Sequence, residues 1–476
     1  MKRLCTLILT ILMLMTFGAC GIGGTAETEP SGPVELWIVT EQTPVDGFTL
    51  QIQNMIEQFE LEHEDVTIRL DILPTEAEER AVYLESIRTE ILTGGGPDGY
   101  LLPASNLLTL DKPQKYTYIR VERLFYDVEL GMRNGMFADI REYYDADDEL
   151  NTNGLVTAVM DAGVVDGARY VLPLTYDIPV LIADTERLES SGMDIDRILN
   201  GTILELMEVA IESGDKFWAC GAEPASMGTD KSLRYFSQLI DYDKGEVALT
   251  AEEAAAFLRT YQALEALVAG EYLHRGSMDG TSYILEDMHP GSSPFVIYQK
   301  GLKGTLDSVA VAKAAEREIT MVPIRTTSGN VVADVGYYAA VGSGCDQVGL
   351  CYEFLRMFLT EESQWNESGI PDGWPVRAKG AAEKLWSYQR MKYTGEWADE
   401  AGQRPRRRRL LEVKLSDADM PILDADIDRA RFRLQLEWDS HLTIDLNDEF
   451  GNPTDADIGQ IAQDLIQNLQ WHLAEG

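Results

Sequence analysis

Two prolines interrupt a long apolar stretch between residues 167 and 184, which reads GARYVLPLTYDIPVLIAD. Pro173 and Pro179 flank a polar pair, Tyr176-Asp177. Each proline removes a backbone donor and favours extended geometry in the residue before it, so an ordinary central strand would not carry both. The stretch is therefore interpreted as an extended crossover between two lobes, with the polar pair on the wall of a cleft. An edge strand with one exposed tyrosine is the alternative.

The chain begins with the features of a secretion signal. Two basic residues precede an apolar run from Leu4 to Phe17, which is too short for a membrane-spanning helix. The run leads into Phe-Gly-Ala-Cys, which resembles the lipobox of bacterial lipoproteins. This resemblance implies that residues 1–19 are removed and that Cys20 carries a lipid, with plain secretion as the alternative. Residues 20–32 then form a flexible tether.

Charge and motif content limit the partners of the chain. The formal charge is −40, and it becomes −42 when the signal and its two basic residues are lost. Nucleic acids and anionic membranes bind basic surfaces, so neither is an expected partner. The histidine and aspartate spacings match no zinc or EF-hand site, and no nucleotide-binding or hydrolase motif occurs. The sequence therefore predicts neither a cofactor nor a metal.

Cysteine usage leaves one question open. Cys220, Cys345 and Cys351 remain once the signal and the lipid site are set aside. Cys345 and Cys351 are close enough in sequence to form a disulfide outside the cell, and buried free thiols are the alternative.

Hydrophobic periodicity predicts alternating strands and helices from residue 34 to residue 102. Strands are expected at 34–39, 66–72 and 99–102, and two amphipathic helices fall between them. Thr75-x-x-Glu78 predicts a capping box at the start of the second helix. This order indicates an α/β sheet that is covered on both faces.

The alternation restarts after residue 184, and a second long extended run follows at 330–342. A chain with two such runs passes between lobes more than once, which predicts a hinge and a cleft. The other expected elements are helices at 202–213, 346–360, after a capping Thr250 and after Thr454, and strands at 216–220, 294–299 and 319–324.

Five segments resemble, in order, the carbohydrate-binding group of extracellular solute-binding proteins from bacterial ABC importers, family 1, which includes maltodextrin-binding protein. The segments are 89–102, 166–181, 321–359, 370–379 (IPDGWPVRAK) and the final helix. The resemblance covers essentially the whole mature chain. Residues 395–450 depart from the family because they are longer and more charged than its usual C-terminal region.

This resemblance implies an α/β, two-lobed periplasmic-binding-protein-like fold of type II with an interlobe cleft. Three crossovers are expected, near 176–179, 334–338 and 370–374. The expected division assigns 33–175 plus 338–370 to lobe 1 and 178–334 plus 374–476 to lobe 2.

The resemblance further implies a lipid-anchored, monomeric receptor on the outer face of the cell membrane, without enzymatic activity. It would capture a carbohydrate, an oligosaccharide or related polyol, and deliver it to an ABC permease. Sugar recognition uses aromatic faces together with carboxylates that accept from hydroxyls, placed at strand ends and crossovers. The candidate ligand-binding residues are Glu41, Asp98, Tyr100, Tyr176, Asp177, Trp218, Tyr298, Tyr337, Tyr338 and Trp374. Each aromatic could instead belong to the core, and Asp98 could cap a turn.

Other functions remain open on the sequence alone. One is a secreted glycan-active enzyme that uses two carboxyl groups as acid and base. Another is a receptor of the same fold for a peptide, a polyamine or a metal chelate. The basic run at 404–409 is either a docking patch or a solvated loop.

Overall fold

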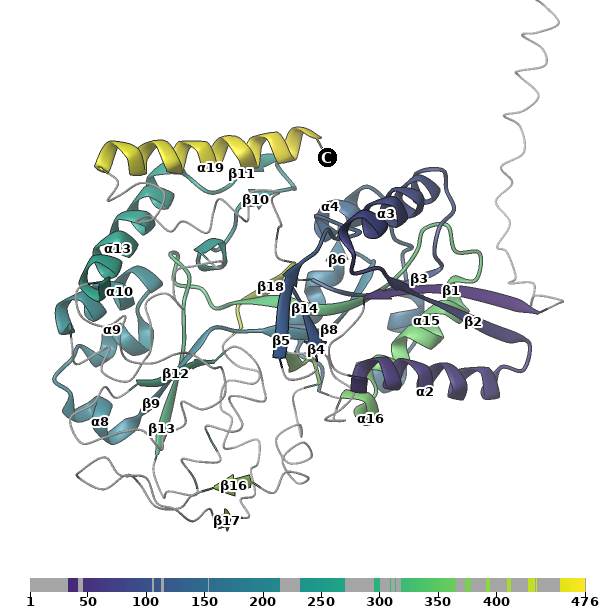
Figure 1. Cartoon of the computed structure of the whole chain (residues 1–476), viewed down its shortest axis with the longest axis horizontal. Coiled ribbons are helices and arrows are strands. Elements are labelled where there is room, and N and C mark those ends of the chain that lie inside the picture. The colour runs from purple at the N-terminus through teal and green to yellow at the C-terminus, as the bar shows by residue number, and fades with distance from the viewer. Residues whose placement is uncertain are drawn as a thin grey trace, which may run out of the picture.

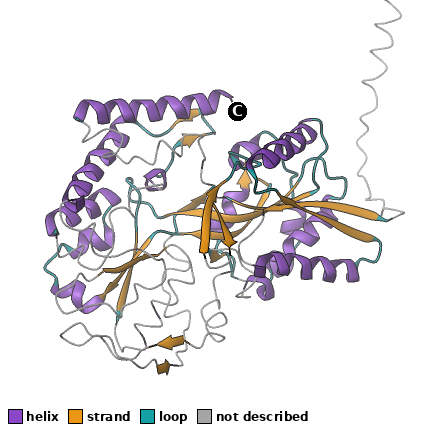
Figure 2. Ribbon diagram, in the orientation of Figure 1, coloured by secondary structure: helices purple, strands orange, loops and turns teal. Residues whose placement is uncertain are grey.

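The computed structural model describes residues 33–41, 46–104, 107–112, 115–152, 154–214, 232–269, 295–299, 309, 313, 318–364, 373–377, 391–393, 409–411, 427–432, 434 and 454–475. These residues form two α/β lobes that are joined by crossing segments (Figure 1 and Figure 2). Within these ranges no helix combines the length and the apolar character that crossing a membrane requires.

Lobe 1 is built around a seven-stranded mixed sheet of order β15-β8-β14-β3-β1-β2, and β18 pairs with β14 outside this path. β1 is parallel to β2 and β3, whereas β14 is antiparallel to β3 and β8. The strands are β1 (Val34–Glu41), β2 (Val66–Leu73), β3 (Gly99–Pro103), β8 (Val171–Asp177), β14 (Val332–Val341), β15 (Trp374–Pro375) and β18 (Arg429–Arg431).

Helices cover both faces of this sheet (Figure 1). On one face α2 (Asp46–Glu62) packs with α15 (Val348–Arg356), and the rings of Phe59 and Phe354 meet edge to face at 5.5 Å. On the other face α3 (Ala77–Leu92) and α4 (Val128–Arg133) bury Leu84 and Val128 in a separate cluster. Ile38 of β1 packs in the cluster under α2 and α15, and its neighbour Val39 packs in the cluster under α3 and α4. Both faces of β1 are therefore buried, which explains its continuous apolar sequence.

Short elements complete lobe 1 and its loops. The helical ones are α5 (Arg141–Asp145), α6 (Asp148–Thr152), α7 (Thr157–Met160), η1 (Asp161–Gly163), η4 (Met357–Leu359) and α16 (Glu361–Gln364). Antiparallel pairs form between β4 (Leu107–Lys112) and β5 (Lys115–Arg120) and between β6 (Val164–Val165) and β7 (Ala168–Arg169). A separate pair, β16 (Met391–Tyr393) with β17 (Arg409–Leu411), belongs to neither main sheet.

Lobe 2 contains a three-stranded sheet of order β12-β9-β13 and its own core cluster. The final helix α19 (Asp455–Glu475) packs against α13 (Ala251–Ala269), which also contacts α10 (Ile203–Ser213) (Figure 1). Its elements are β9 (Val180–Asp184), α8 (Thr185–Ser190), α9 (Ile195–Asn200), α10 (Ile203–Ser213), η2 (Ser232–Tyr235), β10 (Ile240–Asp241), β11 (Glu246–Val247), α13 (Ala251–Ala269), β12 (Phe295–Gln299), β13 (Ile319–Pro323) and α19 (Asp455–Glu475).

The proline-containing stretch at 167–184 does cross between the lobes. Its first half is β8 of lobe 1 and its second half is β9 of lobe 2, with Ile178 and Pro179 between them. Pro173 lies inside β8, close to a register shift in the pairing with β14, where the ladder is already irregular. The edge-strand alternative is wrong, because β8 lies between β14 and β15.

The second crossover lies further upstream than the sequence indicated. β13 ends at Pro323 and β14 begins at Val332, so the chain changes lobes at 324–331 rather than near 334–338. Near the third expected crossover, β15 pairs with β8 and therefore belongs to the sheet of lobe 1. The full lobe boundaries stay a prediction.

Most predicted elements are confirmed, and one cap is wrong. The second helix begins at Ala77 after Glu76, and no side chain caps it, so Thr75 and Glu78 form no capping box. Thr250 does cap α13, since its hydroxyl accepts from the amide of Glu253 at 3.2 Å. The expected strand at 216–220 lies outside the described residues.

Candidate ligand-binding site between the lobes

One edge of the lobe 1 sheet gathers several of the predicted site residues. Glu41 ends β1, and Tyr176 and Asp177 end β8. In the strand pairing, Asp177 lies opposite Asp334, and Tyr176 lies opposite both Val335 and Trp374. The edge where β1 and β8 end is therefore also the edge at which the chain passes into lobe 2.

Glu41 forms a buried ion pair with Arg80 of α3. Both side chains are nearly inaccessible, with exposed fractions of 3% and 1%. Arg80 Nη1 lies 3.0 Å from Glu41 Oε2, and the second nitrogen also contacts the carboxylate. Burial raises the pKa of Glu41 above its ordinary value, and the hydrogen bonds and charge of Arg80 oppose that rise. In this arrangement the carboxylate joins the end of β1 to α3.

The aromatic side chains at this edge are packed inside the protein. Tyr176 and Trp374 stack with their ring centroids 6.4 Å apart, and both are almost fully buried. Tyr337 and Tyr338 belong to different core clusters, on opposite faces of the sheet. The Tyr337 hydroxyl donates to the carbonyl of Leu101 at 3.3 Å. The arrangement matches the core alternative, and ligand contact by these rings stays a prediction.

Asp98 and Tyr100 lie toward the opposite end of β3. The carboxylate of Asp98 accepts from the backbone amide of Trp37 at 2.8 Å, and its carbonyl accepts from Cys351 Sγ at 3.3 Å. Tyr100 is enclosed by two phenylalanines in the core. Asp98 thus joins the beginning of β3 to β1, which is a structural role. Cys345 and Cys351 are both buried free thiols, so this pair forms no disulfide.

Three predicted sites cannot be placed. Cys20 and Trp218 lie outside the described residues, and Tyr298 is described only in its backbone, which pairs with Leu181 in the lobe 2 sheet.

A small cavity of about 50 Å³, lined by both apolar and hydrogen-bonding side chains, lies between the lobes. One wall is α4 of lobe 1, a second is β10 with its neighbours in lobe 2, and a third is β18 and the residues after it. Its hydrogen-bonding side chains come from all three walls: Asp127, Glu129, Gln238, Tyr242, Arg429 and Arg431.

Contacts across this cavity hold the two lobes together. Asp127 caps α4 by accepting from the amide of Leu130 at 2.9 Å. Its carboxylate also accepts from the Tyr242 hydroxyl and lies 2.8 Å from His472 Nε2 of α19. Arg133 pairs with Asp243 at 2.8 Å on the outer side of the same interface. A single carboxylate of lobe 1 therefore contacts two elements of lobe 2.

A buried charge network lies beside the cavity, where the chain crosses between the lobes. Asp334 of β14 is 3.1 Å from both Arg234 of η2 and Arg431 of β18. Arg431 also donates to lobe 2 carbonyls, at 2.6 Å to Phe236 and 2.8 Å to Arg234. The network fixes β14 and β18 against η2, so it connects the crossing strands to lobe 2.

Burial in the cavity shifts the pKa values of two facing groups. It raises the pKa of Glu129, which the hydrogen bond and charge of Arg133 oppose. It lowers the pKa of Arg429, which the charge of Glu129 opposes. Arg429 Nε has no hydrogen-bond partner among the described residues. The cavity therefore offers carboxylate acceptors and a half-buried guanidinium donor to a polar ligand.

The sequence analysis missed this cavity. Asp127 stands directly before an apolar helix start, which is a readable capping signal, but capping does not reveal that Tyr242 and His472 approach the same carboxylate. Arg429 and Arg431 lie in the region where the family resemblance is weakest. Only the pairing of β18 with β14 brings them to the crossing strands.

Solved structures share this fold at low sequence identity. An extracellular solute-binding protein family 1 from Alicyclobacillus acidocaldarius aligns with a TM-score of 0.52 and 13% identity over 94% of this chain and 100% of that one. The sugar-binding protein MalE from Xanthomonas citri aligns with a TM-score of 0.55 and 13% identity over 93% of this chain and 98% of that one.

A designed cysteine esterase, ECH19, also aligns, with a TM-score of 0.55 and 12% identity over 93% of this chain and 98% of that one. The fold by itself therefore excludes no chemistry. No protein-family model matches the chain, and no curated protein matches its sequence. In its architecture, the chain has the two-lobed α/β fold of the extracellular solute-binding proteins.

Proposed function

We propose that the chain is the lipid-anchored receptor of an ABC importer and that it captures a carbohydrate between its lobes. The observation that carries this proposal is the interlobe cavity, which is lined by hydrogen-bonding side chains from both lobes and from β18. Proteins that enclose a ligand by closing two lobes need contacts of this kind on both sides.

The side chains of the cavity suit a sugar. Asp127 and Glu129 would accept from hydroxyl groups, and Arg429 would donate to ring or hydroxyl oxygens. Phe432 also lines the cavity and offers an apolar face to the C–H surface of a ring. Acidic and basic groups occur together, which favours a neutral polyol over a strongly cationic ligand.

Ligand entry requires the lobes to separate. The cavity of about 50 Å³ is far smaller than the roughly 300–1,000 Å³ of ordinary small-molecule sites. Opening about the crossovers at 178–179 and 324–331 would break the contact of Asp127 with Tyr242 and His472. Closure on a sugar would then restore these contacts or replace them with contacts to its hydroxyls.

The remaining parts of the proposal concern location and partners. A lipid on Cys20 and the tether at 20–32 would hold a monomeric receptor at the outer face of the cell membrane, beside its permease. The acidic surface keeps the body of the protein away from anionic lipid, while the tether allows it to reach the permease.

A thermal-shift screen of monosaccharides and oligosaccharides tests this function. A sugar that binds only the folded protein raises its melting temperature. Arg429→Met should weaken binding of the best sugar by about tenfold or more, because it removes a charged donor. Arg197→Met on α9, far from the cavity, is the matched control. The proposal fails if no sugar binds, or if the bound sugar is recovered in a cleaved form.

A further inference from the structure

Arg429 of β18 lacks a partner for its charge in the part of the chain that the structure describes. The side chain lines the interlobe cavity and is half-buried, so its guanidinium can be reached from there. Its Nε is buried without a hydrogen-bond partner among the described residues, and the guanidinium forms no ion pair with a described carboxylate. A donor that has lost water without gaining an acceptor is unfavourable.

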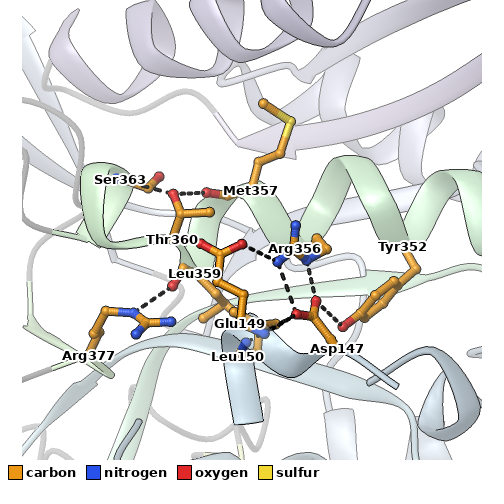
Figure 3. A network of polar contacts seen from close by, with 10 residues as sticks. All are labelled: Asp147, Glu149, Leu150, Tyr352, Arg356, Met357, Leu359, Thr360, Ser363 and Arg377. Atoms are coloured by element: carbon orange, nitrogen blue, oxygen red, sulfur yellow. Dashed lines mark hydrogen bonds and ion pairs between the residues drawn. The ribbon is translucent and has the colours of Figure 1, made fainter. Parts of the chain in front are cut away.

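Other partly buried arginines of this protein do have acceptors. Arg356 donates to Asp147 at 3.0 Å and to Glu149 at 2.7 Å (Figure 3). Arg431, two positions after Arg429 in the same strand, donates to carbonyls of lobe 2 at 2.6 and 2.8 Å. Arg429 differs from both because its wall of the cavity offers it no acceptor.

The carboxylates of the cavity are already engaged by other groups. Asp127 lies 2.8 Å from His472 Nε2 across the lobes. Glu129 pairs at 3.3 Å with Arg133, and it affects Arg429 through its charge without forming an ion pair with it. The missing acceptor must therefore come from outside these side chains, and a ligand in the cavity is in the position to supply it.

An anionic group suits this position best. A guanidinium binds a carboxylate more strongly than a neutral oxygen, and its planar fork can hold both carboxylate oxygens at once. Burial lowers the pKa of Arg429, and a negative charge in contact would oppose that effect, as the charge of Glu129 already does. The mixed charges of the cavity disfavour a cation, and the unpaired guanidinium further favours an acidic sugar over a neutral one.

Two features of the cavity limit the negative charge of the ligand. Asp127 and Glu129 lie in its wall and would repel a doubly charged group such as a phosphate ester. Arg431, the other guanidinium in the wall, already pairs with Asp334 at 3.1 Å, so Arg429 would bind the anion alone. A carboxylate, which carries a single charge, matches these conditions better than a phosphate.

We propose that the carbohydrate captured between the lobes is an acidic sugar and that Arg429 binds its carboxylate. The inference rests on the proposed function, because it names the class of sugar that the same site takes. The hydroxyls of the sugar would donate to Asp127 and Glu129, whose carboxylates accept more than one hydrogen bond each. The acid group would thus lie beside β18 and the hydroxyls beside α4.

Calorimetric titration with matched pairs of sugars tests the proposal. Trisaccharides of galacturonate, glucuronate and mannuronate are compared with trisaccharides of galactose, glucose and mannose in the same linkages. We expect the acidic member of at least one pair to bind about tenfold or more tightly than its neutral counterpart. Methyl esterification removes the charge and keeps the ring, so the ester of that acidic sugar should lose this advantage.

Arg429→Gln removes the charge of the side chain and keeps polar groups. It should weaken binding of the preferred acidic sugar about tenfold or more and binding of its methyl ester by less than about twofold. The melting temperature without sugar should stay equal or rise, because the substitution breaks no hydrogen bond to a described residue. Arg197→Gln on the surface of lobe 2 is the matched control, and it should change either affinity by less than about twofold.

The inference is overturned if the neutral trisaccharides bind as tightly as the acidic ones, or if sugar phosphates bind more tightly than the uronates. It is also overturned if Arg429→Gln weakens binding of the acidic sugar and of its ester equally. In each of these cases a sugar still binds, so the proposed function stands. If no sugar of either kind binds, the proposed function fails and this inference fails with it.

Discussion

The hydroxyl of Tyr242 in lobe 2 donates a hydrogen bond to the carboxylate of Asp127 in lobe 1, although the two residues lie 115 positions apart in the chain. The same carboxylate meets His472 of the final helix. Burial raises the pKa of the Tyr242 hydroxyl, and the neighbouring charge of Asp127 adds to this effect. Tyr242 therefore stays protonated and keeps donating at physiological pH.

Tyr242→Phe should favour the open arrangement of the lobes. A hydrogen bond to a charged group contributes about 1.5–3 kcal/mol, so the ratio of closed to open molecules should fall about tenfold or more. Small-angle scattering of the ligand-free protein would show this as a larger radius of gyration. Tyr126→Phe is the control, because its hydroxyl donates to Glu122 at 2.6 Å within lobe 1 alone. Equal scattering from the two variants would contradict the role of Tyr242.

Arg431→Met should strongly destabilise the protein. Arg431 reaches Asp334 and several lobe 2 carbonyls, and Asp334 is only 2% exposed. Asp334 keeps its ion pair with Arg234 in this variant, but it loses one of its two charged donors, and the buried carbonyls of Phe236 and Arg234 lose theirs. Leaving buried acceptors unsatisfied costs about 1–3 kcal/mol each. Urea unfolding measures the loss.

Arg197→Met supplies the comparison for that measurement. Arg197 pairs with Glu208 and Glu212 on the surface of lobe 2, and such exposed pairs contribute at most about 1 kcal/mol. If the two arginine variants unfold at the same urea concentration, the network at Asp334 does not stabilise the crossing strands.

Asp71→Ala should cost stability at neutral pH and much less in acid. The carboxylate accepts from Trp37 Nε1 at 2.9 Å and from the Tyr83 hydroxyl at 2.6 Å. Burial acts to raise its pKa, but these hydrogen bonds and Arg69 outweigh it and hold the pKa below the ordinary 3.8. Because the pKa of Asp71 is lower in the folded protein than in the unfolded chain, the ionised carboxylate stabilises the fold above pH 3.8. This stability is lost as the pH falls through the pKa that Asp71 has in the folded protein.

The expected loss in Asp71→Ala is about 1–3 kcal/mol at pH 7, from the two donors left unpaired. Unfolding curves collected from pH 7 down to about pH 2 give the free energy of unfolding of the variant and of the unsubstituted protein. The difference between the two should shrink below the ordinary carboxyl pKa. Asp65→Ala, at an exposed turn, should show no comparable loss. A difference that stays constant with pH would indicate that packing rather than charge is responsible.

Two glycines should respond to alanine in opposite directions. A Cβ at Gly342 would lie 2.2 Å from the carbonyl oxygen of Pro97, so Gly342→Ala should destabilise lobe 1 by about 1–3 kcal/mol. Gly459 of α19 has open space around that position. Gly459→Ala should therefore stabilise the protein by about 0.5–1 kcal/mol. Thermal unfolding of both variants checks whether the melting temperature falls for Gly342→Ala and rises for Gly459→Ala. An unchanged melting temperature of Gly342→Ala would contradict the close packing of Gly342 against the Pro97 carbonyl.

The architecture could be predicted from the sequence because most of its helices and strands have a clear local pattern of apolar and polar residues. The alternation at 66–72 and the apolar run at 34–39 predicted β2 and β1, and two prolines in one apolar stretch marked a crossover. The Thr75 cap failed because Glu76, not Thr75, occupies the position before the helix, which begins at Ala77. Short-range patterns therefore located elements better than they located helix starts.

The site could be predicted only in part, for a physical reason. Tyr176 and Trp374 were chosen by residue type and position. The sequence does not show that other parts of the chain pack over both side chains and bury them. The interlobe cavity depends on Asp127, Tyr242 and Arg429, which come from distant segments and meet only after the sheet has formed. Burial and long-range pairing determined the site, and neither leaves a local signal.

The position of β14 in its sheet has a consequence for how this chain is made. β14 lies between β3 and β8, so the sheet of lobe 1 lacks an inner strand until residues 332–341 have been synthesised. Structures that depend on such distant pairings form slowly. Strands β3 and β8 therefore lack the partner that lies between them until about two thirds of the chain has left the ribosome.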